Sequence, residues 1–251
     1  MQPQTKEELA QIIYETCQEK GWDCDLNFID TSKITDMSFL FSDEENDGYG
    51  LEHFNGDISK WDTSNVTDMS FMFAGAYNFN QPLNTWNTSH VTNMYCMFAL
   101  AFNFNQSIND WNVSNVTDMA GMFHRAVKFN QSINDWNVSN VTDMAGMFAL
   151  TDNFNQPLNN WNVSNVKTMV RMFSNAHSFN QPLDNWNTNN VDDMTFMFSD
   201  AKSFKSEIPD FRNYKGTKEE LFDELGLPPD FKPKIKKEQE QEMAHKKGIC
   251  R

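Results

Sequence analysis

The sequence predicts an α/β repeat solenoid: a stack of about seven 25-residue coils, each a short helix plus a short parallel strand, with a helical cap at each end. Three observations predict this fold class. The twenty residues from Phe104 to Phe123 recur letter for letter from Phe129 to Phe148. Phenylalanine and methionine columns keep a spacing of 25 residues. Six tryptophans keep it too, and we predict that they form the structural core: Trp61, Trp86, Trp111, Trp136, Trp161 and Trp186.

The helix of each coil is predicted from the spacing of apolar residues. In one unit they recur at steps of three and four, which places them on one face of a short helix: Val66, Met69, Met72, Phe73 and Ala76. Asp68 lies at the start of this segment, where a carboxylate suits the positive end of a helix. A second pattern follows, in which Trp86 and Thr88 alternate with Thr85 and Asn87. Alternation is typical of a strand, with the first pair inward and the second outward.

Neither element buries its apolar face alone, so the coils are expected to stack into one continuous core. Glycine is scarce, with 10 residues in 251, so the turns need another stabilising residue. Asparagine serves, because its amide bonds nearby backbone. We predict an asparagine ladder that bonds the backbone of adjacent coils, formed by Asn80, Asn105, Asn130, Asn155 and Asn180.

The segment FNQPLNNWNVSNVKTMVRMF, residues 154–173, and its sister units resemble a bacterial surface-protein repeat of 25 to 26 residues, grouped with the BspA-like leucine-rich repeats. The resemblance covers about residues 29–211. It implies a right-handed, leucine-rich-repeat-like solenoid that binds proteins or mediates adhesion at bacterial surfaces. It brings no catalytic residues.

The ends of the chain carry capping signals. Thr5-x-x-Glu8 and Thr217-x-x-Glu220 both read as capping boxes. We therefore divide the chain into an N-terminal capping helix (1–21), the repeat solenoid (22–214), a C-terminal cap (215–230) and a charged, partly disordered tail (231–251). The first coil carries extra residues at DEENDGYG (43–50), which predict a bulge. Cys17 and Cys24 lie where a helix meets a strand, and whether they pair is left open.

Charge and composition exclude several partners. The formal net charge is -15, which disfavours nucleic acid because phosphate contacts need clustered Lys and Arg. From Phe231 onward the charge is +4, which leaves -19 for the rest of the chain. No segment approaches eighteen apolar residues, so no membrane insertion is expected. The N-terminus lacks a signal-peptide pattern, so the sequence as given indicates the cytoplasm, whereas the resemblance implies the cell surface or secretion.

The sequence does not predict an enzyme. The five histidines occupy unrelated positions of the repeat, without metal-ligand spacing: His53, His90, His124, His177 and His245. Asp110 and Asp135 are interpreted as neighbours on a solvated face, because a catalytic base needs a pocket that shifts its pKa. Calcium-binding β-rolls need glycine-rich turns that are missing here. We expect no catalytic residues, no metal and no cofactor.

Binding is the predicted function, with a protein partner and a monomeric chain. The outward strand columns are expected to form a concave, polar, acidic face: Asp62, Thr85, Asn87, Asp110, Asn112, Asp135, Asn137, Asn160, Asn162, Asn185 and Asn187. Hydrogen bonding along the stack is an equal alternative role for them. Two columns on the helix side vary strongly, one running from Phe71 and Cys96 to Phe196, the other from Tyr77 and Phe102 to Lys202. The alternative functions are a self-assembly scaffold and, third, a glycan-binding adhesin, although these outward columns contain no aromatic residue.

Overall fold

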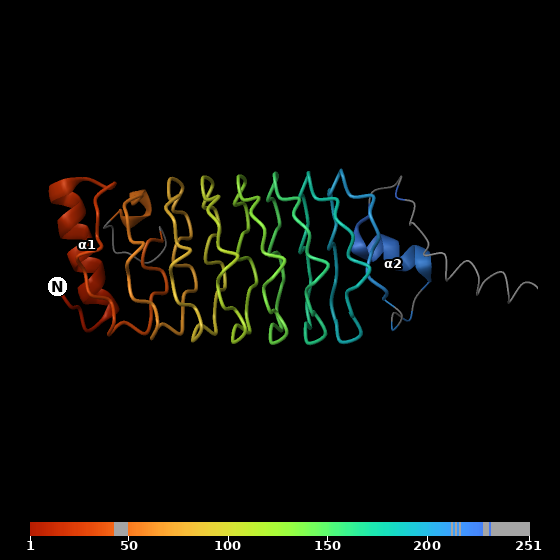
Figure 1. The fold of residues 1–251 in the computed structure, drawn as a ribbon. Coiled ribbons are helices and arrows are strands. Elements are labelled where there is room, and N and C mark those ends of the chain that lie inside the picture. The colour runs from red at the N-terminus through yellow and green to blue at the C-terminus, as the bar shows by residue number, and fades with distance from the viewer. Residues whose placement is uncertain (43–49, 212, 214, 216, 228–230, 232–251) are drawn as a thin grey trace, which may run out of the picture.

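The computed structural model describes residues 1–42, 50–211, 213, 215, 217–227 and 231. Coils follow one another along a nearly straight axis, between the helices α1 (Lys6–Lys20) and α2 (Lys218–Leu225) (Figure 1). A 3-10 helix, η1 (Leu51–His53), lies early in the stack. Apart from Phe231 and Gly50, the predicted tail and the predicted bulge lie outside the described residues, and the predicted domain limits stay a prediction.

The α/β prediction is wrong. Within the described residues, the coils between α1 and α2 contain turns and isolated parallel bridges, with η1 as their one helical element and no strand or sheet. The leucine-rich-repeat-like solenoid with a helix and a strand in each coil is therefore not what this sequence forms. One column of bridges joins each coil to the next through Asp36, Asp68, Asn93, Asp118, Asp143, Thr168 and Asp193.

The segment predicted as a helix is a run of turns with left-handed residues. Phe71 has φ 54° and Gly75 has φ 73°, and equivalent pairs recur in the following coils. A positive φ interrupts an α-helix but suits the third position of a type II turn. Spacings of three and four residues therefore arise here from successive turns.

The backbone donors of this run are divided between two directions. Met69 and Phe71 donate to Asn93 and Tyr95 of the next coil at 3.0 and 2.8 Å, whereas Met72 donates back to Met69 at 3.2 Å. Alternate N–H groups thus join coils, and the groups between them close turns. Trp86, predicted inside a strand, likewise donates to Leu83 three residues earlier.

The core consists of stacked aromatic rings. Trp86, Trp111 and Trp136 are 3–4% exposed, and consecutive indoles lie 6.4 and 6.5 Å apart with planes inclined by 2°. Each indole N–H is also satisfied inside the core, as where Trp136 Nε1 donates to the Ile108 carbonyl at 3.0 Å. The phenylalanine columns stack in the same way, with Phe98 and Phe123 5.8 Å apart. Coils are thus held by ring packing and by buried hydrogen bonds.

The predicted asparagine ladder is confirmed. The Oδ1 atom of each asparagine accepts from the backbone N–H of its equivalent in the next coil, at 2.9–3.0 Å, through Asn55, Asn80, Asn105, Asn130, Asn155 and Asn180. Lys205 N ends the ladder on Asn180 Oδ1 at 2.8 Å. These side chains satisfy backbone donors that no strand pairing serves.

The two helices cover the ends of the stack. The capping box predicted at Thr217 and Glu220 is confirmed. At α1, Thr5 accepts from Glu8 N, but the Glu8 carboxylate accepts from Gln4 N at 2.7 Å, one residue before the predicted partner. The Cys17 and Cys24 sulfurs lie 3.7 Å apart as free thiols.

Candidate functional site

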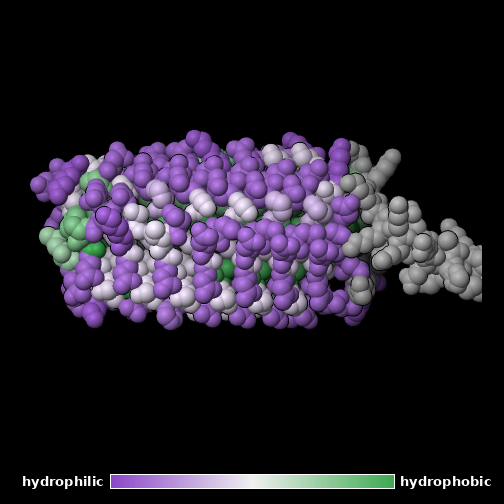
Figure 2. Space-filling model, in the orientation of Figure 1, coloured by the Kyte–Doolittle hydropathy of each residue, from purple (hydrophilic) through white to green (hydrophobic). Residues whose placement is uncertain are grey.

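The predicted polar face consists of exposed residues. All eleven of its side chains are exposed, while the tryptophans between them are buried. Figure 2 shows rows of hydrophilic side chains running from coil to coil along one face of the stack.

Many polar atoms of this face bond the protein itself. Asn112 Oδ1 accepts from Ser114 N at 3.1 Å, and Asn87, Asn137, Asn162 and Asn187 do the same for the residue two positions on. This contact is an Asx turn, which stabilises local backbone. Asp135 Oδ2 accepts from Asn109 Nδ2 at 3.0 Å. The face therefore has a structural role, and its role in binding stays a prediction.

A second surface carries exposed aromatic rings. Phe39 and Phe71 stack with ring centroids 4.5 Å apart, and Tyr95 meets Phe71 edge-on at 4.9 Å. Tyr95 is 38% exposed, and Phe39 and Phe71 are partly exposed. We call these three residues the aromatic row. Phe71 belongs to a column that the sequence identified as variable. Tyr95 was not predicted, because the helical pattern singled out the adjacent column, that of Phe71 and Cys96. The column of Tyr95 also varies, from Ser70 to Thr195.

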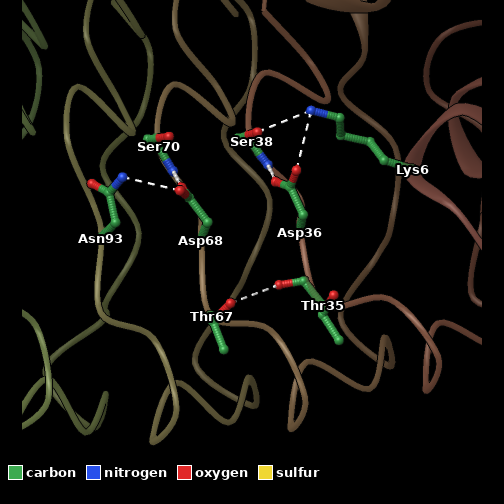
Figure 3. A network of polar contacts seen from close by, with 8 residues as sticks. All are labelled: Lys6, Thr35, Asp36, Ser38, Thr67, Asp68, Ser70 and Asn93. Atoms are coloured by element: carbon green, nitrogen blue, oxygen red, sulfur yellow. Dashed lines mark hydrogen bonds and ion pairs between the residues drawn. The ribbon is translucent and has the colours of Figure 1, made fainter.

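The column of bridging residues defines an acidic row: Asp36, Asp68, Asn93, Asp118, Asp143, Thr168 and Asp193. The Oδ1 atoms of its aspartates and asparagine accept from the backbone N–H two residues on, as where Asp68 accepts from Ser70 N at 2.8 Å (Figure 3). The Asx turns fix the carboxylates in equivalent positions from coil to coil.

Two of these carboxylates have partners from elsewhere in the chain. Lys6 Nζ of α1 lies 3.4 Å from Asp36 Oδ2 and donates to Ser38 Oγ at 3.0 Å (Figure 3). Burial opposes the ionisation of Asp36, but hydrogen bonds from Ser38 and the charge of Lys6 outweigh it and lower the pKa of this carboxyl. In the next coil, Asn93 Nδ2 donates to Asp68 Oδ2 at 3.0 Å.

The middle of the acidic row lacks such compensation. Burial raises the pKa of Asp118, and the charges of Asp143 and Asp68 add to this effect against a hydrogen bond from Ala120 N. Among the residues that the structure describes, neither Asp118 nor Asp143 forms an ion pair. The Tyr95 pKa is raised first by Cys96, then by burial and by the charges of the same two aspartates.

The other variable column is also partly exposed. Tyr77 is 37% exposed, and its ring lies 5.1 Å from that of Phe102. Phe28, 45% exposed, lies in the outward column that continues with Thr85, Asp110 and Asp135, and Lys20 Nζ lies 5.5 Å from its ring centroid. An aromatic residue therefore does occupy that column, before those considered from sequence.

The described histidines lie apart, each with local surroundings. His177 Nδ1 contacts Asp152 Oδ1 at 2.8 Å, and His90 Nδ1 contacts the Ser64 carbonyl at 2.6 Å. His124 is partly buried, and burial together with Arg125 lowers its pKa. His245 lies outside the described residues. In the described part, no group of three or more His, Cys, Asp or Glu side chains is placed to hold a metal ion.

The sequence matches the family described as "Mycoplasma protein of unknown function, DUF285" over residues 11–126 and again over residues 103–211. The two matches overlap, as expected for a repeat. No curated protein and no solved structure matches the chain. Of the helices in the described residues, none has the length and apolar character needed to cross a membrane.

Proposed function

The chain belongs to the DUF285 family of bacterial repeat proteins, and we propose that it is a non-enzymatic module that binds a protein partner at the bacterial surface. The observation that carries this proposal is the aromatic row, in which partly exposed rings from three consecutive coils contact one another. Contiguous exposed aromatic surface is typical of protein interfaces, because its burial on binding is favourable.

The surrounding architecture supports a display function. Asparagine and tryptophan hydrogen bonds hold each coil to its neighbour, so the rows keep their spacing without a partner. A rigid surface loses little conformational entropy on binding. The coils with identical sequence carry Ala120, Gly121, Ala145 and Gly146 where the first coils carry aromatic residues. The aromatic side chains are thus not demanded by the repeat itself.

Capture with matched variants tests the proposal. The purified full chain is immobilised and exposed separately to host cell-surface proteins and to the bacterium's own lysate. The test variant, F71G/Y95S, takes its new residues from the same columns of other coils, namely Gly121 and Ser70. We expect a protein retained by the parent chain and lost with F71G/Y95S, while circular dichroism stays unchanged.

The polar face provides the comparison. N112R/N137R/N162R changes the face predicted from sequence and leaves the aromatic row intact. Loss of capture in this variant alone would move the binding surface to the polar face. Retention of no protein by any form, above the bare matrix, would refute the binding function.

A further inference from the structure

The aromatic row and the acidic row lie side by side on one surface. Tyr95 lies two residues after Asn93 of the acidic row and its N–H donates to Asn93 Oδ1 at 3.0 Å, while Asn93 bridges Asp118 in the next coil and Asp118 bridges Asp143 in the one after. Beyond Tyr95 the next two coils carry only small residues at the two turn positions: Ala120, Gly121, Ala145 and Gly146. An added Cβ atom at Gly146 would meet nothing closer than 4.0 Å, so the surface is open at Gly146, whereas Ala120 and Gly121 are buried and a Cβ atom at Gly121 would meet Cys96 Sγ at 2.6 Å.

The surface has a defined end. In the following coil, Val170 and Arg171 replace the small residues, and the Arg171 guanidinium lies 5.9 Å from the Phe196 ring centroid. Thr168 replaces the aspartate of the acidic row in that coil. Asp118 and Asp143 thus lie in the acidic row between Asn93, whose amide bonds Asp68, and Thr168.

The chain itself illustrates what this surface accepts. Lys6 is the one basic side chain in the described residues that pairs with the acidic row, and it bonds Asp36 and Ser38 together. Lys6 reaches the row from α1, outside the repeat (Figure 3). A lysine from outside the stack thus already pairs with the first carboxylate of this row, Asp36.

Resting on the proposed protein-binding function, we propose that this surface docks an extended, lysine-bearing segment of the partner protein. Its lysines lie over Asp118 and Asp143, as Lys6 lies over Asp36, and its apolar parts cover Phe71 and Tyr95. Opposite charge selects the basic segment, and the aromatic rings contribute apolar burial and cation–π contact.

The spacing of the carboxylates along the stack is compatible with the spacing of side chains along an extended peptide. Carboxylates in adjacent coils are separated by about 4.8 Å, the usual distance between bridged chains. An extended peptide places alternate side chains about 6.7 Å apart on one face. The flexible four-carbon lysine stem spans the difference, and the partly exposed Ala145–Gly146 pair leaves room for the peptide backbone.

A peptide titration tests this assignment on the full chain. The probe is a dye-labelled peptide of alternating lysine and serine with two leucines at one end, followed by fluorescence anisotropy, and its acetyl-lysine version lacks the charges. The variant D118N/D143N keeps the local turns, because Asn93 already accepts from Tyr95 N in this row at 3.0 Å. The control D184N/D200N removes two charges elsewhere, and its asparagines match Asn159 and Asn175 of the preceding coil.

We expect D118N/D143N and F71G/Y95S each to raise the peptide Kd about tenfold, and D184N/D200N to change it less than about twofold. Acetylation of the lysines should abolish binding, and added salt should weaken it. An equal loss in D184N/D200N, or binding that survives acetylation, would overturn the proposal. So would salt-sensitive self-association of the chain that D118N/D143N abolishes, since the occupant would then be a second copy.

The same variants separate this inference from the general function. If the captured protein is retained equally by D118N/D143N, the lysine-docking surface is refuted and the binding function stands. If nothing is captured by the parent chain, the binding function itself fails.

Discussion

Gly146 and Gly121 provide a direct test of the turn run that replaces the predicted helix. Both occupy the left-handed position, with φ of 60° and 62°. A Cβ atom added at Gly146 meets only Ala149 Cβ at 4.0 Å, so Gly146→Ala is a test of backbone conformation alone. We expect it to lower the free energy of unfolding by about 1 kcal/mol, because L-residues disfavour this region.

Gly121→Ala adds a steric conflict. Its Cβ would lie 2.6 Å from Cys96 Sγ but 3.9 Å from Cys96 Cβ. Overpacking of this kind costs about 1–3 kcal/mol beyond the conformational effect. Removing the sulfur with Cys96→Ala should therefore return the cost of Gly121→Ala to that of Gly146→Ala, a coupling that a double-mutant cycle measures.

Urea unfolding followed by tryptophan fluorescence supplies these free energies. Parent, G146A, G121A, C96A and C96A/G121A are compared at one temperature and one salt concentration. A helix through this segment would make both alanine substitutions stabilising, since alanine favours helices over glycine. Stabilisation by G146A, or an equal cost for G121A with and without Cys96 Sγ, would refute the left-handed turn geometry.

Three further predictions concern the core, an acidic side chain and a thiol pair. Trp136→Ala should cost about 3–5 kcal/mol in urea unfolding, because it removes a buried ring that is 3% exposed and its bond to a core carbonyl. Asp118→Asn should raise the melting temperature at about pH 7 but not at about pH 3. Burial raises the pKa of this carboxyl, so ionisation favours the unfolded state above the folded pKa and has no effect when both states are protonated. Oxidised glutathione should join Cys17 and Cys24, lowering the mass by two hydrogens and stabilising the fold by about 2 kcal/mol. Burial and Cys24 raise the Cys17 pKa to about 12, which makes the reaction slow.

Each of these has a result that contradicts it. A negligible loss for Trp136→Ala would mean that the indole is not a core group. A rise in melting temperature for Asp118→Asn that persists at about pH 3 would have a cause other than the ionisation of this carboxyl. Retention of both thiol hydrogens after prolonged oxidation, with Cys24→Ser as reference, would show that the 3.7 Å approach does not lead to bonding.

The sequence located the buried columns but not the backbone that carries them. Strict spacing places Trp136 and Phe148 inside any stack of equivalent coils, whatever the conformation between them. The asparagine ladder followed for the same reason, because an amide recurring every 25 residues meets its copy in the next coil. Spacings of three and four residues, however, do not distinguish a helix from successive turns. Left-handed Phe71 and Arg171 were not predictable, since bulky residues seldom adopt positive φ.

The candidate site was only partly predictable. The sequence singled out the column of Phe71 because it varies, yet Tyr95 joins Phe71 from the adjacent column, a contact that depends on the turn geometry. The acidic row was interpreted as helix starts, since Asp68 precedes an apolar periodic segment. Its function as a column of bridges beside exposed rings depends on the packing of separate coils, which no local pattern encodes.

The direction of the hydrogen bonds between coils determines how the protein responds to force. The backbone N–H groups of Met69, Phe71 and the ladder asparagines all point along the stack to a neighbouring coil. Pulling the two ends apart therefore strains one intercoil boundary in series with the next. When a boundary opens, its coil releases 25 residues, about 85 Å of extended chain. A molecule anchored at one end and bound to its partner at the other would lengthen in equal steps, and would dissipate a pull before the attachment breaks.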